Sequence, residues 1–354
     1  MKIFHTSDLH LESALTTRLS SDKVRERKRE LLSSFRRSVE LAEAEGAEVY
    51  VIAGDLFDTE KATSRTLDDV IYTVSSHPNI TFFYLFGNHE GELILKKKSE
   101  LPENLKLFDS EWTYYEISGV CFIGRTECSE NMFDSITLDE KKTNIVILHG
   151  ELLDHSGADS IGKKEIESLP IDYLALGHYH TYSAVKIGKR TTAVYSGTPE
   201  GRGFDEAGEK GGVLIETDGG EISHRFIPTA KRTLHIIELD LSEATCAAEI
   251  EDLVADATAK IPSADIVRAL LIGKRDILLR IDTAHLSEIF KRRFYYFEAK
   301  DNTRAKICAE DFKNDHSLKG EFIRCVINNE KLSESEREKV IIAGISALLG
   351  EEIE

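Results

Sequence analysis

The sequence lacks the features of several protein classes. Its five cysteines are odd in number and none pair as Cys-x-x-Cys, which argues against a thiolate metal site and favours a reducing cytoplasm. No apolar run reaches the roughly 18 residues that a membrane-spanning helix needs. The amino terminus enters strand-like sequence directly, without a signal-peptide pattern. We therefore expect a cytoplasmic protein with no membrane segment.

Positive charge is also scarce. The formal net charge is -18, which lowers the expectation of a free-standing nucleic-acid-binding protein, because affinity for phosphates comes mostly from Lys and Arg. One basic cluster, at residues 23–37, holds seven basic and two acidic side chains, and we interpret it mainly as the solvated face of an amphipathic helix. Nucleic acid is not excluded, because metal ions bound in a site invert the local electrostatics.

Strand-like and helical patterns alternate through the first two-thirds of the 354 residues. A helix with Leu31, Phe35, Val39 and Ala42 on one face precedes Gly46, where it would stop, and residues 66–74 predict a second helix. The strand-like runs are residues 49–55, 81–90, 120–124, 144–151, 173–180, 191–199 and 211–216. Continuous apolar strands separated by helices predict an α/β fold whose sheet is covered on both faces.

The composition changes near residues 227–228, where a second domain is expected to begin. A strand at 234–241, a helix at 243–260 and two strands joined tightly at residues 273–275 predict a small α+β domain containing a hairpin. The end of the chain reads as helical, and Ser333 with Glu336 three residues later has the pattern of a capping box.

Polar side chains of metal-binding type follow several of the predicted strands. After the first strand, Asp8 and His10 are two residues apart, and strand alternation would place both on one side. In open α/β sheets, ligands bind beyond the carboxyl ends of strands. The candidate side chains at such ends are Asp8, His10, Asp55, Asn88, His89, His149, His178 and His180. Each alone reads as an ordinary turn, packed or surface group, but together they are expected to gather at one edge.

The chemistry of this set points to divalent metal ions. Carboxylates, imidazoles and one amide, without sulfur, suit Mn²⁺, Fe or Zn²⁺ better than Ca²⁺ or Cu⁺. Two such ions about 3.5–4 Å apart can clamp the attacking and leaving oxygens of a phosphoryl displacement and lower the pKa of a bridging water.

The segments DLH, GDLFD, GNHE, HG and GHYH, in that order and spacing, closely resemble those of the calcineurin-like metallophosphoesterases. The resemblance implies a four-layer sandwich of two sheets flanked by helices. It implies that one ion is held by Asp8, His10, Asp55 and His180. It implies that a second is held by Asp55, Asn88, His149 and His178, with Asp55 bridging. His89 would face the phosphate and protonate the leaving oxygen or steady the transition state.

Two further segments narrow the resemblance. GDLFD with residues 195–212 is similar to the SbcD-type DNA-repair exonucleases, and DLHLES is similar to their YhaO-like branch. This implies a DNA nuclease of the 3'-5' exonuclease or endonuclease type that uses two divalent ions, most simply Mn²⁺, to activate a hydroxide. It also implies a nuclease domain at 1–230, a capping domain at 231–300 and a helical tail at 301–354.

The same resemblance implies DNA as substrate, an SMC-like ATPase of the SbcC or YhaN type as partner, and homodimerisation. Two interpretations of the tail stay open: it docks the ATPase, or it packs on its own domain. The alternative function is a phosphodiesterase or phosphatase acting on nucleotides or other small phosphate esters, towards which the acidic composition leans. A non-catalytic scaffold is disfavoured, because the full set of ligand positions is present.

Three smaller expectations concern residues near the motifs. Glu90 stands where many family nucleases have aspartate, and we expect this difference to affect the rate rather than the presence of activity. Tyr179 is expected to pack into the sheet. For Arg202 and Phe204, a substrate contact and a plain loop are both open, and the loop is favoured.

Overall fold

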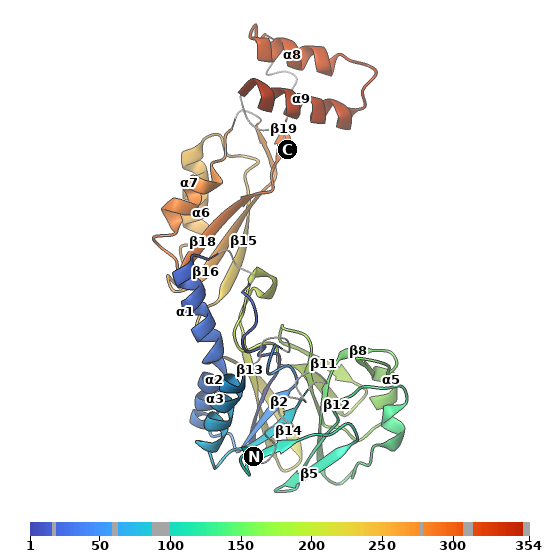
Figure 1. The fold of residues 1–354 in the computed structure, drawn as a ribbon. Helices are drawn as coiled ribbons and strands as arrows, with labels where there is room; N and C mark the ends of the chain where they lie inside the picture. Colours follow the sequence, from blue (N-terminus) through green and yellow to red (C-terminus); the bar gives the residue numbers. More distant parts are fainter. Residues whose placement is uncertain (16–18, 59–62, 87–99, 277–278, 307–313, 350–354) are drawn as a thin grey trace. The chain divides into compact units, whose positions relative to one another are not determined.

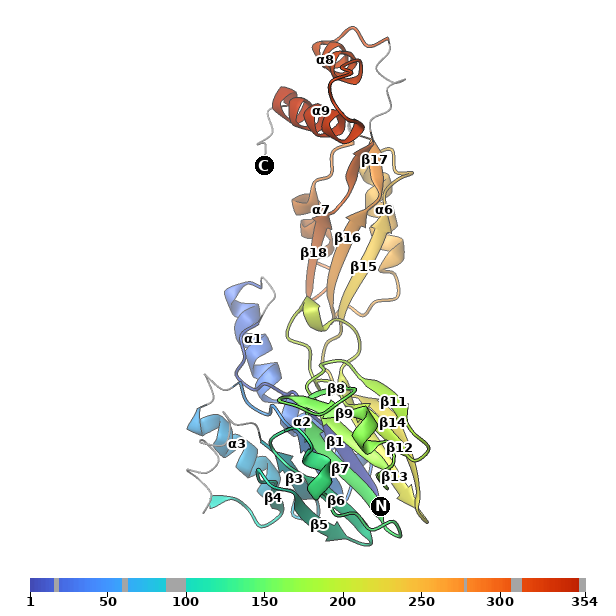
Figure 2. The same ribbon diagram turned by 90° about the vertical axis from the view of Figure 1, so that its right-hand side faces the viewer.

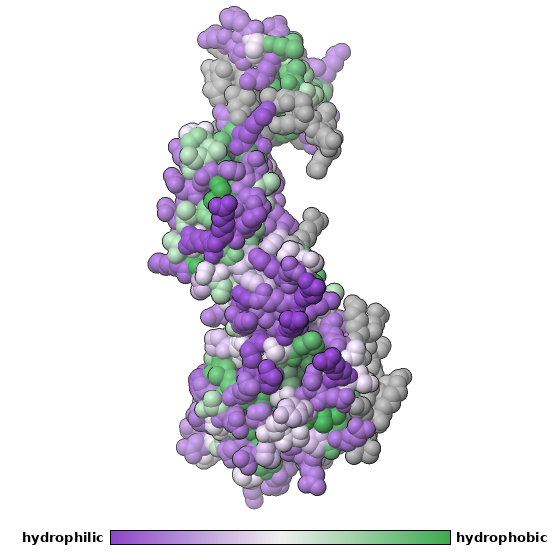
Figure 3. Space-filling view, turned by 60° about the vertical axis from the view of Figure 1, so that its left-hand side comes forward, coloured by the Kyte–Doolittle hydropathy of each residue, from purple (hydrophilic) through white to green (hydrophobic). Residues whose placement is uncertain are grey.

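The computed structural model describes residues 1–15, 19–58, 63–86, 100–276, 279–306 and 314–349 (Figure 1). The chain divides into two compact units, Met1–Leu234 (unit 1) and His235–Glu354 (unit 2). Within the described ranges, no helix is both long enough and apolar enough to cross a membrane. The face shown in Figure 3 is mostly hydrophilic, with scattered hydrophobic residues, as a composition with 31% charged residues requires.

Two six-stranded sheets form the centre of unit 1. The first sheet contains, in spatial order, β14 (Glu221–Pro228), β13 (Gly211–Asp218), β1 (Lys2–Thr6), β2 (Val49–Ala53), β3 (Thr81–Leu85) and β4 (Leu105–Leu107). The second contains β11 (Ser183–Ile187), β12 (Thr191–Tyr195), β10 (Tyr173–Gly177), β7 (Thr143–His149), β6 (Val120–Gly124) and β5 (Thr113–Ile117). Strands β1 to β4 run parallel, as do β12, β10, β7 and β6, and antiparallel strands complete the edges.

The two sheets pack face to face between two outer layers. Strand β2 shows why its sequence is apolar throughout: Val51 faces the second sheet, whereas Tyr50 faces the helices. The outer face of the first sheet is covered by α2 (Ser34–Ala44) and α3 (Ser64–Ser75). The second is covered by η2 (Met132–Ser135), β8 (Glu151–Leu153), β9 (Ser160–Gly162) and α5 (Lys163–Ile166). In Figure 1 the helices α2 and α3 and the segments β8 and α5 lie on opposite sides of the sheets. The expected sandwich of two sheets between flanking layers is confirmed.

The basic cluster forms two helices rather than the single helix that the sequence predicted. Helix α1 (Ser21–Leu32) is followed by Ser33 as its C-cap, and α2 begins at Ser34. The hydroxyl groups of Ser33 and Ser34 donate to the carbonyl oxygens of Glu30 and Leu31, at 3.0 and 2.7 Å, and such bonds from serine bend helices.

Two charged side chains of the basic cluster, Arg27 and Glu30, depart from a solvated face. Arg27 is 1% exposed and pairs with Glu30 and Glu200, at 2.6 and 2.8 Å. Arg25, Lys28, Arg29 and Arg36 are exposed, as the interpretation of a solvated helix face requires.

Unit 2 contains a three-stranded sheet with two helices on one face (Figure 2). Its elements are β15 (Leu234–Asp240), β16 (Ile266–Ile272), β18 (Tyr296–Asp301), α6 (Ala247–Ala257) and α7 (Thr283–Phe290). Val254 of α6 and Phe290 of α7 join Val267 and Leu271 of β16 in one apolar cluster. The helix predicted at 243–260 is therefore present but shorter.

The predicted hairpin at residues 273–275 is wrong. Strand β16 pairs with β18 in parallel, and β17 (Lys274–Asp276) pairs with β19 (Arg304–Lys306), again in parallel. Both pairs run in the same direction, so the chain bends at Gly273 and continues forward instead of turning back. Gly273 has a φ of 95°, and an added Cβ would lie 2.0 Å from Asp240 Oδ1, so glycine is required at this bend.

Two helices, α8 (Leu318–Ile327) and α9 (Glu334–Leu349), end the described chain and share a small apolar cluster that includes Ile323 and Ile341. The predicted capping box is confirmed. The Ser333 backbone N–H donates to Glu336 Oε2 at 2.8 Å, and the Glu336 N–H donates to Ser333 Oγ at 3.3 Å.

Candidate metal centre

Four strand ends place the candidate side chains. Asp8 and Asp55 follow β1 and β2 in the first sheet, and His149 ends β7 in the second, where His180 follows β10. Each of these strand pairs is parallel, so each presents its carboxyl ends at one edge. The two edges meet, because the His178 backbone N–H lies 3.1 Å from both carboxylate oxygens of Asp8.

The side chains form two groups of metal-ligand type. In each group the ligand atoms lie within 4.8 Å of one another: Asp8, His10 and His180 form the first, and Asp8, Asp55 and His149 the second. Asp55 Oδ2 is 3.6 Å from His10 Nε2 and 3.5 Å from His149 Nε2. Asp55 therefore stands between a histidine of each group, whereas Asp8 belongs to both groups.

Asp8 and His10 converge for a different reason from the one expected. Strand β1 ends at Thr6, and Asp8 and His10 have φ values of 53° and 43°, so strand alternation does not apply to them. Instead, the Asp8 N–H donates to Gly54 O at 3.1 Å and the His10 N–H donates to Asp55 O at 2.9 Å. The loop after β1 is thus held against the loop after β2, and this contact brings the side chains together.

Two glycines allow this close approach. An added Cβ at Gly54, which has a φ of 90°, would lie 2.2 Å from His149 Nδ1. An added Cβ at Gly177 would lie 1.9 Å from Ala53 O and 2.6 Å from His149 Nδ1. Gly54 is needed both for its positive φ and for the space beside His149, whereas Gly177 is needed for the space alone.

The hydrogen bonds fix which nitrogen of His149 faces the centre. His149 Nδ1 is 2.9 Å from Ala53 O, and a carbonyl can only accept, so Nδ1 carries the proton. The lone pair of Nε2 then faces Asp55 Oδ2 at 3.5 Å. Two facing electron-rich atoms are favourable when a cation lies between them, so the residues present fit a divalent ion.

The first group has the same character. His10 Nε2 and His180 Nε2 are 3.3 Å apart, and His180 Nε2 is 3.8 Å from Asp8 Oδ1. Burial, followed by the charge of Arg202, lowers the pKa of His10, which favours the neutral ring that a metal requires. Burial opposes ionisation of Glu206, but hydrogen bonds from His180 and Arg202 hold the pKa of Glu206 down at about 2.

The other residues predicted at the site are not part of the two ligand groups. His178 is exposed and belongs to neither group, although its ring makes an edge contact with that of His149, with centroids 5.6 Å apart. Asn88, His89 and Glu90 lie outside the described residues.

Sequence reasoning missed the residues behind the ligands. Glu206 is 3% exposed, and its Oε1 lies 2.7 Å from His180 Nδ1. It also pairs with Arg202, and Phe204 is 6% exposed. Whether Arg202 or Phe204 contacts a substrate stays a prediction. No spacing pattern links Glu206 to the motifs.

Tyr179 differs from expectation. It is 42% exposed instead of packed into the sheet. Its hydroxyl donates to Glu151 Oε1 at 2.5 Å, and its ring makes edge contacts with Tyr195 and His178, at centroid distances of 4.8 and 5.3 Å.

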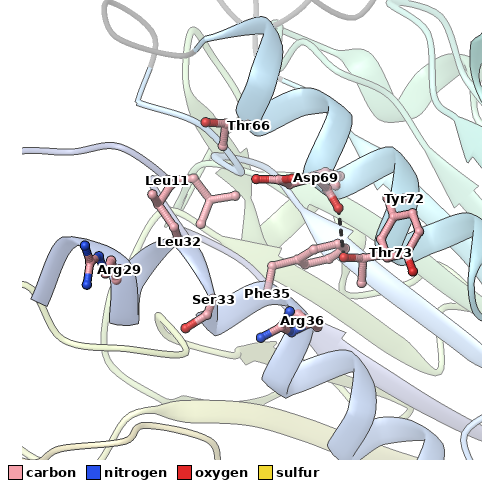
Figure 4. A pocket seen from close by; sticks show the side chains of 11 residues that line it. Leu11, Arg29, Leu32, Ser33, Phe35, Arg36, Thr66, Asp69, Tyr72 and Thr73 are labelled. Carbon is pink, nitrogen blue, oxygen red and sulfur yellow. Dashed lines mark hydrogen bonds between the residues drawn. The ribbon is translucent and has the colours of Figure 1, made fainter. Parts of the chain in front are cut away.

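A pocket of about 230 Å³ lies elsewhere in unit 1, between the loop after β1 and helices α1, α2 and α3 (Figure 4). Leu11, Leu32 and Phe35 line it, with Arg36 and Tyr72 among its other residues. None of the candidate ligands that the structure describes lines this pocket, so it is separate from the two ligand groups.

Comparisons with known proteins identify the family of this chain and several of its relatives. Residues 1–182 match the model of the family described as calcineurin-like phosphoesterase. The metallophosphoesterase YhaO of Bacillus subtilis is 24% identical over 74% of this chain and 68% of its own length. The SbcD component of the SbcCD nuclease of Staphylococcus epidermidis is 27% identical over 69% of this chain and 74% of its own length.

A third relative, the DNA double-strand break repair protein Mre11 of Methanosarcina acetivorans, is 27% identical over 65% of this chain, and the match spans 39% of the relative. Among solved structures, TT1561 of Thermus thermophilus aligns over 64% of this chain and 98% of its own, with a TM-score of 0.41 and 14% identity. A dimetal phosphatase from Danio rerio aligns over 65% of this chain and 96% of its own, with a TM-score of 0.43 and 11% identity.

The family match covers half of the chain and contains all four strand ends that carry the candidate ligands. The chain therefore belongs to the calcineurin-like phosphoesterase family, and it is a hydrolase of phosphoester bonds that uses divalent metal ions.

Proposed function

We propose that this chain is a DNA nuclease acting in DNA repair, of the 3'-5' exonuclease or endonuclease type. The proposal is carried by the two ligand groups that share Asp8, in a chain whose relatives include a nuclease component and a DNA double-strand break repair protein. Divalent ions bound there would supply Lewis-acid charge for the phosphoryl oxygens and lower the pKa of a bound water.

The proposed ligands divide between two ions. The first would be held by Asp8, His10, Asp55 and His180. The second would be held by Asp55, His149, His178 and Asn88. Oxygen and imidazole donors without sulfur suit Mn²⁺, Fe or Zn²⁺, and of these we propose Mn²⁺. His89 would face the phosphate and donate a proton to the leaving oxygen.

The proposal extends to domains, partners and location. Residues 1–230 would be the nuclease domain, 231–300 a capping domain and 301–354 a tail that docks an SMC-like ATPase of the SbcC or YhaN type. A net charge of -18 disfavours DNA binding by this chain alone, and such a partner would supply much of the DNA affinity. The cysteine pattern favours the cytoplasm, and we propose a homodimer.

An assay with two substrate classes and added Mn²⁺ tests the proposal. One set holds linear single- and double-stranded DNA, and the other holds a generic phosphodiester and nucleotides. His89→Ala reports contaminating nuclease, and His155→Ala, at an exposed histidine six residues beyond His149 in sequence, is the matched control.

DNA degradation that disappears in His89→Ala and persists in His155→Ala would support the nuclease. Turnover of small esters with intact DNA, both alone and with the ATPase added, would favour the alternative, a phosphodiesterase or phosphatase of small phosphate esters. The acidic composition is the observation that favours this second function.

A further inference from the structure

A buried carboxylate stands directly behind one of the proposed ligands. Glu206, in η3 (Phe204–Glu206), is 3% exposed, and its Oε1 lies 2.7 Å from His180 Nδ1. Its other oxygen accepts the backbone N–H of Arg202 at 2.7 Å, and the Arg202 Nε–H donates to Oε1 at 2.9 Å. The carboxylate is therefore held in one orientation, with one oxygen directed at the imidazole.

This contact decides which nitrogen of His180 can bind a metal. A carboxylate accepts hydrogen bonds, so the bond to Glu206 requires the proton on Nδ1. The lone pair of Nε2 is then free on the side of Asp8 and His10. Arg202 NH2 also lies 3.0 Å from His180 Nδ1. This group is a donor and donates to the Glu206 carboxylate, so the proton on His180 Nδ1 is kept.

The two ligand groups differ in this respect. His180 in the first group is backed by the Glu206 carboxylate, which also pairs with Arg202, whereas His149 in the second is backed by the neutral carbonyl of Ala53, at 2.9 Å. A carboxylate makes the imidazole a stronger donor to a metal than a carbonyl does. The hydrogen-bond acceptor behind the histidine therefore differs between the two ligand groups, and the affinities of the two ion sites should differ with it.

The segment that carries Glu206 is anchored on several sides. Lys210 Nζ donates to His180 O at 2.7 Å, and Arg27 of α1 donates to Gly201 O at 2.6 Å. Arg27 also pairs with Glu200 at 2.8 Å, and both side chains are 1% exposed. These bonds restrain the backbone on both sides of Glu206, so His180 and Glu206 keep their relative position.

We propose that Glu206 is a positioning residue that holds His180 ready for metal and makes the group of Asp8, His10 and His180 the tighter of two unequal ion sites. This inference rests on the metal binding proposed above. It goes beyond that proposal in two ways. It gives Glu206 the role of orienting His180, and it predicts which of the two sites binds its ion more tightly.

The test is a calorimetric titration of the metal-free, full-length protein with Mn²⁺. The wild-type chain should bind two ions with different affinities. Glu206→Gln keeps the size of the side chain and removes its charge, and it should weaken the tighter step by about 10- to 100-fold while leaving the weaker step unchanged. Asp205→Asn removes the same charge from the exposed neighbouring residue and should leave both steps as in the wild type.

Loss of the charge on Glu206 leaves Arg202 without its main partner, so the double variant Arg202→Gln with Glu206→Gln accompanies the single one. It should show the same selective weakening. Equal binding by all variants, equal weakening of both steps, or unfolding of both Glu206 variants in the metal-free state would overturn the proposal. A wild-type chain that binds no Mn²⁺ would overturn the metal centre as well.

Discussion

His5 should make the stability of unit 1 depend on pH in a range where the carboxylates of the chain contribute little. His5 lies in β1 and is 0% exposed, and its Nδ1 is 3.1 Å from the Tyr173 hydroxyl. Burial, with a smaller effect from His224, lowers the pKa of His5 from 6.5 to about 3. Between these two pKa values, His5 is neutral in the folded chain and protonated in the unfolded chain.

The sign and size follow from this difference. Below 6.5 the unfolded state binds a proton on this residue and the folded state does not, so stability falls as the pH falls. Each pH unit is worth about 1.4 kcal/mol, which gives a loss of about 2 kcal/mol at about pH 5. The result hardly depends on the folded value, provided that this value lies well below 5. Carboxylates such as Glu30, whose pKa is lowered to about 2, keep their charge throughout this range.

The assay compares the wild-type chain with His5→Asn by urea unfolding in the presence of a chelator. The single tryptophan, Trp112, reports on unit 1, where its Nε1–H donates to Met132 O at 2.9 Å. Between about pH 7.5 and pH 5 the wild type should lose about 2 kcal/mol more than His5→Asn. His155→Asn, at an exposed histidine, should follow the wild type. Equal losses in the wild type and His5→Asn would refute the reasoning.

Three further predictions concern backbone, charge and helix ends. Gly54→Ala and Gly119→Ala both place a Cβ at a positive φ, of 90° and 82°, which should cost about 1–2 kcal/mol in each variant. Only the Cβ at Gly54 also overlaps His149, so Gly54→Ala should cost more and should abolish ester hydrolysis. Equal activity of the two variants would contradict this. Arg27→Met should lower the urea stability of unit 1 by about 3–5 kcal/mol, because it leaves buried carboxylates short of a partner; a loss below about 1 kcal/mol would count against it. Ser333→Ala should speed amide exchange in the first turn of α9, at a cost of about 1 kcal/mol, and unchanged exchange would argue against the cap.

The gathering of the ligands could be predicted from sequence because it depends on topology. Parallel strands bring their carboxyl ends to one edge, so Asp8, Asp55, His149 and His180 meet once the strands are correctly assigned. The residue types then limit the chemistry. The α/β sandwich could be predicted for the same reason, from apolar strands such as β2 that are buried on both faces.

Local conformation and long-range contacts could not be predicted in the same way. The positive φ values of Asp8 and His10 arise from hydrogen bonds to a loop more than 40 residues away in sequence, and strand alternation gave the right neighbours for the wrong reason. The bend at Gly273 resembles a turn until the partner strands β18 and β19 are known. Glu206 lies in the short 3-10 helix η3, where no periodicity links it to His180.

The most direct test of the metal centre is anomalous diffraction at the manganese edge from crystals of the protein grown with Mn²⁺. We predict two peaks about 3.5–4 Å apart. One should contact Asp8, His10 and His180, the other His149, and Asp55 should lie between them. A single ion, or peaks that avoid these side chains, would contradict a two-metal centre at this edge of the sheets.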